Sequence, residues 1–161
     1  MEHEVVASRR LVRAVLDTSS LVPPRLRRDL QEAAQLEMYV GIWSPWIIAE
    51  LNRVLVWRWI ERKGVQSERE CSRQAKAMMD ILLPSFELVP ALPPYPPAWE
   101  TLSDRWDHPI WAAAKEGNAQ YVISANTLDF PPRNSDGRHV HEEIEYLPGH
   151  AFLGRLAKGI E

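Results

Sequence analysis

The stretch Val12-Arg-Ala-Val-Leu16-Asp17-Thr-Ser-Ser20 decides the fold class, because a short apolar run ends there in polar residues. Its apolar part is nearly continuous, which is typical of a strand covered on both faces. Tyr121-Val-Ile-Ser124 repeats this pattern, and Phe86-Glu-Leu-Val89 and Ile144-Glu-Tyr-Leu147 predict further strands. We therefore expect a small parallel sheet built from these segments.

Helical patterns lie between the predicted strands. Ser44 is a typical N-cap, and Pro45 fits the first position of a long helix that runs to Lys63, where Gly64 ends it. A capping box predicts another helix start near residue 67. The expected helices span 26–36, 45–63, about 67–83, 109–116 and 149–156. Because strands alternate with helices, the sequence predicts an α/β sandwich.

Length and composition indicate one globular domain. The chain has 161 residues, of which 45% are apolar and 25% charged. We expect a single domain over residues 1–161 with a core at about 12–157. The lone Cys71 allows no intrachain disulfide, no run of 18 residues is apolar, and the N-terminal stretch lacks a secretory pattern. We therefore expect a soluble cytoplasmic protein with no membrane association, and the net charge of −3 gives no general electrostatic case for nucleic-acid binding.

Two acidic residues accompany apolar segments. Asp17 ends the first predicted strand, at the edge where ligands gather in an open parallel sheet, although Asp also caps turns. Glu50 shares a helix face with Ile47 and Val54, so its charge is expected to face a cleft. The alternative for Glu50 is a boundary residue that pairs with Arg53 or with an arginine elsewhere in the chain.

Further acidic residues fall at comparable places. Asp107 is a candidate N-cap of the helix at 109–116, which is a sufficient structural role but also fixes a carboxylate at the sheet rim. Asp104 can join Asp107 or support it, and Asp129 follows the predicted strand at 121–124. Hard oxygen ligands with few histidines suit Mg²⁺ or Mn²⁺ rather than zinc. If these acids converge, they predict the metal chemistry of a phosphodiester hydrolase.

The order of these motifs resembles the PIN-domain family, the fold of VapC-like toxin ribonucleases. The resemblance spreads over residues 12–153, and its motifs are Val15-Leu-Asp17-Thr-Ser-Ser20, Ser44-Pro-Trp-Ile-Ile-Ala-Glu50-Leu51, Asp104-Arg-Trp-Asp107-His-Pro-Ile-Trp-Ala-Ala-Ala114, Ala119–Pro131 and Ile144–Leu153. It implies a three-layer α/β/α domain that cuts single-stranded or structured RNA with Mg²⁺ or Mn²⁺.

The resemblance also implies roles for particular residues. Asp17, Glu50 and Asp107 would be the catalytic acids and bind metal directly or through water, and Ser19 would support them by hydrogen bonding. Asn126 stands where many members have a fourth aspartate, and an amide oxygen can ligate a metal without adding charge. Asp129 either compensates as a further metal ligand or is a turn residue.

Partners follow from the same resemblance. Family members often pair with an antitoxin whose peptide inserts near the acidic rim, and they often dimerise through helical surfaces. Arg25, Arg27 and Arg28 follow Asp17 closely enough to border the cleft and guide phosphates, or they form a solvated helix face. The expected partners are therefore an RNA substrate, an antitoxin and a second copy of the chain.

Several other patterns favour structural roles. Trp57-Arg58-Trp59 can stack on RNA, but tryptophans packed against a neighbour or a second subunit are the favoured interpretation. His139 and His141 are expected in a solvated loop rather than a metal site. Cys71 is expected to be inert.

The function predicted from sequence is a metal-dependent endoribonuclease that is the toxin of a toxin–antitoxin pair. The alternative is a catalytically weakened PIN-like module that binds RNA or a protein, as the neutral Asn126 suggests. A purely protein-interacting domain is a third interpretation. A haloacid-dehalogenase-type phosphatase also begins with an aspartate after its first strand, but its second aspartate is Ser19 here.

Overall fold

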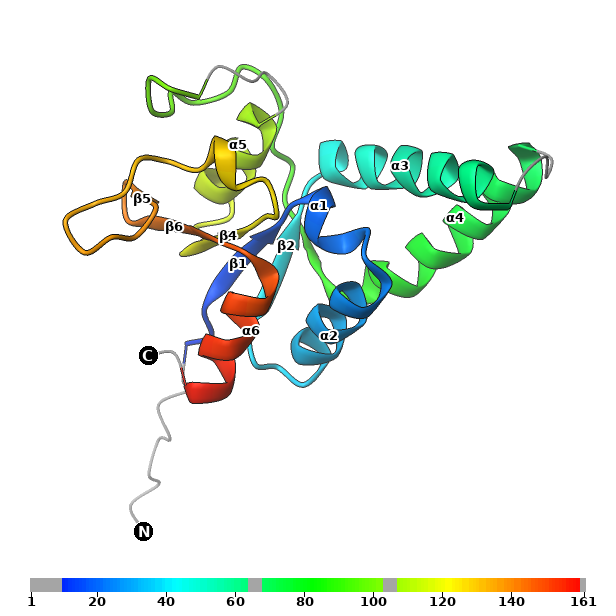
Figure 1. The fold of residues 1–161 in the computed structure, drawn as a ribbon, viewed down its shortest axis with the longest axis horizontal. Coiled ribbons are helices and arrows are strands. Elements are labelled where there is room, and N and C mark those ends of the chain that lie inside the picture. The colour runs from blue at the N-terminus through cyan, green and yellow to red at the C-terminus, as the bar shows by residue number, and fades with distance from the viewer. Residues whose placement is uncertain (1–9, 64–67, 103–106, 160–161) are drawn as a thin grey trace, which may run out of the picture.

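The computed structural model describes residues 10–63, 68–102 and 107–159. Its six-stranded sheet has the order β3-β2-β1-β4-β6-β5, and every neighbouring pair is parallel except β5–β6 (Figure 1). The elements in chain order are β1 (Arg13–Leu16), α1 (Thr18–Leu21), α2 (Pro24–Gln35), β2 (Val40–Trp43), α3 (Pro45–Lys63), α4 (Glu68–Leu82), η1 (Leu83–Ser85), β3 (Glu87–Leu88), α5 (His108–Glu116), β4 (Tyr121–Ile123), η2 (Thr127–Asp129), β5 (Val140–His141), β6 (Ile144–Leu147) and α6 (Gly149–Lys158).

Helices cover both faces of the sheet. α5 packs against β1 and β4, and Gly117 at its end abuts Ile42, which is in register with Val15. On the opposite face, the ring of Phe152 in α6 lies 5.4 Å from that of Tyr121 in β4, and α6 contacts α2. Figure 1 shows α3 and α4 extending together to one side of the sheet. This arrangement is an α/β fold with a mostly parallel sheet, compatible with three layers.

Most predicted elements are confirmed with small changes at their ends. The strands at 12–16, 121–124 and 144–147 are β1, β4 and β6, and the one at 86–89 shortens to β3. The Ser44 cap is confirmed, because its Oγ accepts a hydrogen bond from the Ile47 backbone N–H at 3.3 Å. The predicted stop at Gly64 and the capping box that begins at Ser67 lie outside the described residues.

The sequence interpretation missed β2, α1 and β5. Gly41 in the middle of β2 argues against a strand by propensity. In the structure a Cβ at this position would lie 2.6 Å from Cδ1 of Phe86, so the glycine allows that ring to approach the backbone. Tertiary packing therefore explains a residue that sequence rules treat as a strand breaker.

α3 is the longest helix, with 19 residues, and it carries charged side chains along its length. Its buried side includes Ile47, Leu51 and Leu55, which belong to the hydrophobic core. Within the described ranges, no helix combines the length and the apolar character that crossing a membrane requires.

Candidate active site

The strand order reverses between β1 and β4. The chain proceeds from β1 to β2 and β3 on one side of the sheet, and from β4 to β6 on the other. At such a reversal the connections diverge and leave a crevice outside the carboxyl ends of the strands, where ligands bind. Asp17 directly follows β1 and Ser124 directly follows β4, so both residues lie at the carboxyl edge of the sheet where the order reverses.

Asp17 is buried, with 8% of the residue exposed. Its Oδ2 accepts hydrogen bonds from Ser124 Oγ at 2.7 Å and from Ser19 Oγ at 3.1 Å. Each hydroxyl oxygen in turn accepts a backbone N–H, Ser19 from Ala125 at 2.9 Å and Ser124 from Asn126 at 3.1 Å. Ser19 Oγ and Ser124 Oγ also lie 3.3 Å apart, within hydrogen-bond distance of each other. The ends of β1 and β4 are thereby joined around one carboxylate.

The charge of Asp17 is poorly compensated. Burial raises the pKa of Asp17 by more than the hydrogen bonds from Ser124, Ser19 and the Thr18 backbone lower it. Among the described residues, no lysine, arginine or histidine forms an ion pair with Asp17. A buried carboxylate of this kind either binds a proton or gains from a nearby cation.

Asp107 lies at the N-terminus of α5, and its Oδ2 is buried. Its side chain makes no capping hydrogen bond to the helix, so capping does not account for it. Burial, then the charge of Asp107 and then that of Asp17 raise the pKa of the Tyr146 phenol in β6.

Glu50 lies on the second turn of α3 and is half-buried. It lines a shallow hollow together with Trp46, Ala49 and Arg53. α3 contacts α1, which begins after Asp17, and α5, which begins after Asp107. The helix of Glu50 thus borders the elements of the other two acids, and both interpretations of Glu50 itself stay predictions.

Asn126 and Asp129 are joined at the rim. The side-chain amide of Asn126 donates to Asp129 Oδ2, and the Asp129 backbone N–H donates to the Asn126 carbonyl at 3.2 Å. Asn126 is exposed, and its backbone connects to the Asp17 network through Ser124. Asp129 therefore orients the Asn126 side chain, while the metal-binding roles of both residues stay predictions.

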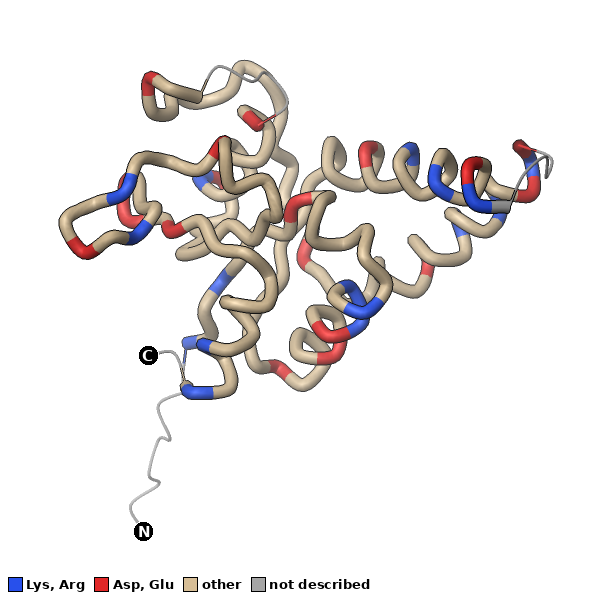
Figure 2. The backbone as a smooth tube through the Cα atoms, viewed as in Figure 1, with Lys and Arg blue, Asp and Glu red and all other residues tan. Residues whose placement is uncertain are grey.

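The prediction that Arg27 guides phosphates is wrong. Arg27 is buried, and its guanidinium donates to the carbonyl oxygens of Leu21 and Val22 at 2.9 and 3.0 Å. Burial, followed by the charge of Arg28, lowers the pKa of this guanidinium. Arg27 thus holds the connection between α1 and α2, whereas Arg25 and Arg28 are exposed on α2, where Figure 2 shows basic positions.

No group of three or more His, Cys, Asp and Glu residues suited to holding a metal occurs within residues 10–63, 68–102 and 107–159. The predicted supporting residue Asp104 lies outside these described ranges. The structure thus joins Asp17, Ser19, Ser124, Asn126 and Asp129 in one hydrogen-bonded network, whereas Asp17, Glu50 and Asp107 do not form a group suited to holding a metal.

The histidine pair is part of a packed region, so the expected solvated loop is wrong. His141 lies in β5 with its ring 5.4 Å from Trp99 and 5.3 Å from Trp111. His139 Nδ1 contacts the Pro131 carbonyl oxygen at 2.8 Å.

The other sequence patterns fall outside this site. Trp59 packs against the core, as favoured, but Trp57 is 57% exposed. Cys71 is buried and free, consistent with the inert role expected for it.

Two residues of the site were missed. Ser124 ends a predicted strand at the same sheet edge as Asp17, so its position was a usable signal. Tyr146 lies inside a strand whose sequence carries no functional signal, and only the sheet register relates it to Asp17.

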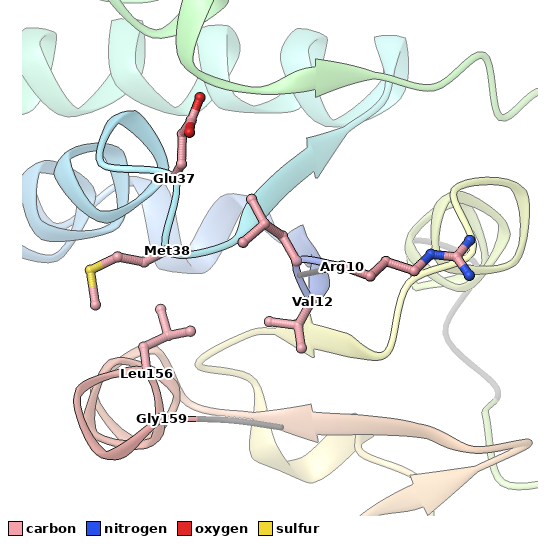
Figure 3. A pocket seen from close by; sticks show the side chains of 7 residues that line it. Arg10, Val12, Glu37, Met38, Leu156 and Gly159 are labelled. Carbon is pink, nitrogen blue, oxygen red and sulfur yellow. The ribbon is translucent and has the colours of Figure 1, made fainter. Parts of the chain in front are cut away.

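A separate hollow lies at the opposite edge of the sheet (Figure 3). Leu11 and Val12 before β1, Met38 before β2 and Leu156 of α6 contribute to its lining. The side chains of Arg10 and Glu37 point away from one another there. This hollow therefore shows no convergence of charged groups comparable with the carboxyl edge.

Comparisons with known proteins support the fold. No protein-family model matches the chain, and no curated protein matches it. Among solved structures, the chain is similar to a protein described as "Crystal structure of PAE2754 from Pyrobaculum aerophilum". The two share 17% identity over 92% of this chain and 91% of that chain, with a TM-score of 0.51. This likeness extends to the α/β fold and covers nearly the whole length of both chains.

Proposed function

We propose that the chain is a PIN-like, three-layer α/β/α endoribonuclease that hydrolyses RNA phosphodiester bonds with a divalent metal. The observation that carries this proposal is the environment of Asp17. This carboxylate is buried at the strand reversal, held by Ser19 and Ser124, and has no ion pair among the described residues. The motif resemblance to the PIN-domain family adds the reaction type.

The oxygen donors proposed for the metal are of the type that Mg²⁺ and Mn²⁺ prefer, although the described residues form no group of three suited to holding a metal. Asp17, Glu50 and Asp107 offer carboxylate oxygens, the ligands that these hard cations prefer. A cation beside Asp17 would also offset the charge that burial disfavours. Asn126 and Asp129 are the candidates for additional oxygen ligands. When bound, such an ion activates water and stabilises the charge that develops on the phosphate.

The residues of the chain contribute orientation and charge. Ser19 and Ser124 hold the Asp17 carboxylate in one position and, by donating to it, favour its ionised form. Glu50 is the proposed base that orients the attacking water, because its helix borders α1 and α5. Arg25 and Arg28 on the exposed side of α2 would bind RNA phosphates.

We further propose that this ribonuclease acts in the cytoplasm as a homodimer and as the toxin of a toxin–antitoxin pair. The support is the resemblance, together with exposed apolar side chains on helices, such as Trp57 in α3. Co-purification with the product of a neighbouring reading frame that inhibits cleavage would test the pairing.

The direct test is hydrolysis of an RNA pool in Mn²⁺ or Mg²⁺. Asp17→Asn should reduce the rate by more than about 100-fold, because even outer partners of metal ligands cost 10- to 100-fold. Asp29→Asn, an exposed position on α2, is the matched control and should cleave like the parent. Equal rates for the parent and Asp17→Asn, purified in parallel, would reject the proposal.

A second candidate is a PIN-like module that binds RNA or protein without turnover. The observation that favours it is the neutral Asn126 amide, which is hydrogen-bonded to Asp129 and adds no charge to the site. RNA binding that is unchanged by metal and by Glu50→Gln, with no cleavage, would support this function.

A further inference from the structure

The hydroxyl of Tyr146 is buried and has no hydrogen-bond partner among the described residues. Its ring is well packed, lying edge-on to Trp99 at 5.3 Å and to Phe130 at 5.5 Å. Only 5% of the residue is exposed, so bulk water does not form hydrogen bonds with the hydroxyl. Buried polar groups that find no hydrogen-bond partner in the protein usually form hydrogen bonds with ordered water.

The sheet register places Tyr146 beneath the candidate active site. Tyr146 is paired with Val122, and Val122 with Val15, so all three side chains point to the same face. Asp17 follows Val15 by two residues in extended backbone and therefore points to that face as well. α5, which covers the face, begins after Asp107. Tyr146 therefore lies on the face of the sheet to which Asp17 also points and which α5 covers.

We propose that Tyr146 is a positioning residue whose hydroxyl donates to one buried water, which donates its own two protons to Asp17 and Asp107. The water would satisfy the phenol and give each acid a donor. It would also hold the two carboxylates in fixed positions. The catalytic consequence rests on the proposed ribonuclease function, but the water itself does not.

The electrostatics agree with a donor role. Burial and the charges of Asp107 and Asp17 raise the pKa of Tyr146, so the hydroxyl keeps its proton at neutral pH. A protonated phenol can donate to a water that serves two carboxylates. The outer contacts of metal ligands commonly set metal affinity in this way.

Tyr146→Phe removes the hydroxyl and keeps the ring. Tyr39→Phe is the matched control, because Tyr39 is also buried but donates to the Leu30 carbonyl at 2.8 Å and packs against Phe152 on the other face. We expect Tyr146→Phe to weaken Mn²⁺ binding, measured from the free-ion EPR signal, by about 10- to 100-fold. It should also lower kcat with KM unchanged, while Tyr39→Phe changes neither metal affinity nor kcat per folded molecule.

A metal-free crystal structure of the parent protein provides the independent readout. A water within hydrogen-bond distance of Tyr146 Oη and of both carboxylates supports the proposal. A side chain from residues 103–106 in that place overturns it, as does unchanged Mn²⁺ affinity in folded Tyr146→Phe. If the parent neither binds Mn²⁺ nor cleaves RNA, the ribonuclease function fails, and the presence or absence of the water still decides the role of Tyr146.

Discussion

Asp17 and Glu145 are two buried carboxylates of the same sheet, and their surroundings differ. Glu145 in β6 is 6% exposed and receives two hydrogen bonds from the Arg155 guanidinium, both at 2.8 Å. Arg138 approaches the same carboxylate at 3.9 Å. Asp17, 8% exposed, receives serine hydroxyls and no cation among the described residues.

The difference separates the structural role of Glu145 from the functional role that we propose for Asp17. The Glu145–Arg155 pair is complete within the fold and ties α6 to the sheet. Asp17 is held by hydrogen bonds but forms no ion pair with any residue that the structure describes, and it lies where the strand order reverses. A carboxylate that is fixed in position but has no positively charged partner suits the binding of a cation from solution, and we propose this role for Asp17.

The largest expected change in the free energy of unfolding comes from breaking the Glu145–Arg155 ion pair. Arg155→Leu should lower the free energy of unfolding by about 3 kcal/mol, because it leaves Glu145 buried with only a distant arginine. Urea denaturation measures the change. Lys76→Gln, which breaks the exposed pair with Asp80, is the control and should cost less than about 1 kcal/mol. Similar losses for both variants would contradict a structural role for the buried pair.

Removing the charge of Asp17 should change the free energy of unfolding in the opposite direction. Without metal, Asp17→Asn should raise the free energy of unfolding at pH 7 by about 1 kcal/mol, because a buried charge without a counter-ion is lost. The pKa of Asp17 is higher in the folded than in the unfolded chain, so the parent loses stability as pH rises from the ordinary value of 3.8 through the raised one. The gap between variant and parent should therefore widen with pH and then level off. Urea titrations at several pH values would refute this if the gap stayed constant.

The smallest effect concerns the arginines of α2. Arg25→Gln combined with Arg28→Gln should weaken RNA binding and reduce its salt dependence by about one phosphate contact per residue. Arg27→Gln should instead destabilise the fold, because the carbonyl oxygens of Leu21 and Val22 lose the hydrogen bonds that the guanidinium donates to them. Binding isotherms at several salt concentrations, with unfolding curves, separate the two classes. A reduced salt slope in folded Arg27→Gln would contradict this division.

Much of the architecture could be predicted from sequence, since alternation and caps such as Ser44 are local signals. β2 could not, because the reason for Gly41 is the distant ring of Phe86. Asp17 and Ser19 were predicted together, and their hydrogen bond is present at 3.1 Å. Arg27 and Tyr146 were misjudged or missed, because the burial of each depends on segments far apart in the chain.

The most direct test of the account is calorimetric titration of Mn²⁺ into the parent protein, Asp17→Asn and the Asp29→Asn control at neutral pH. We expect Mn²⁺ to bind the parent and the control, and to bind Asp17→Asn more weakly by more than about 100-fold. Equal Mn²⁺ affinity in the parent and Asp17→Asn would contradict the claim that this buried carboxylate serves a cation.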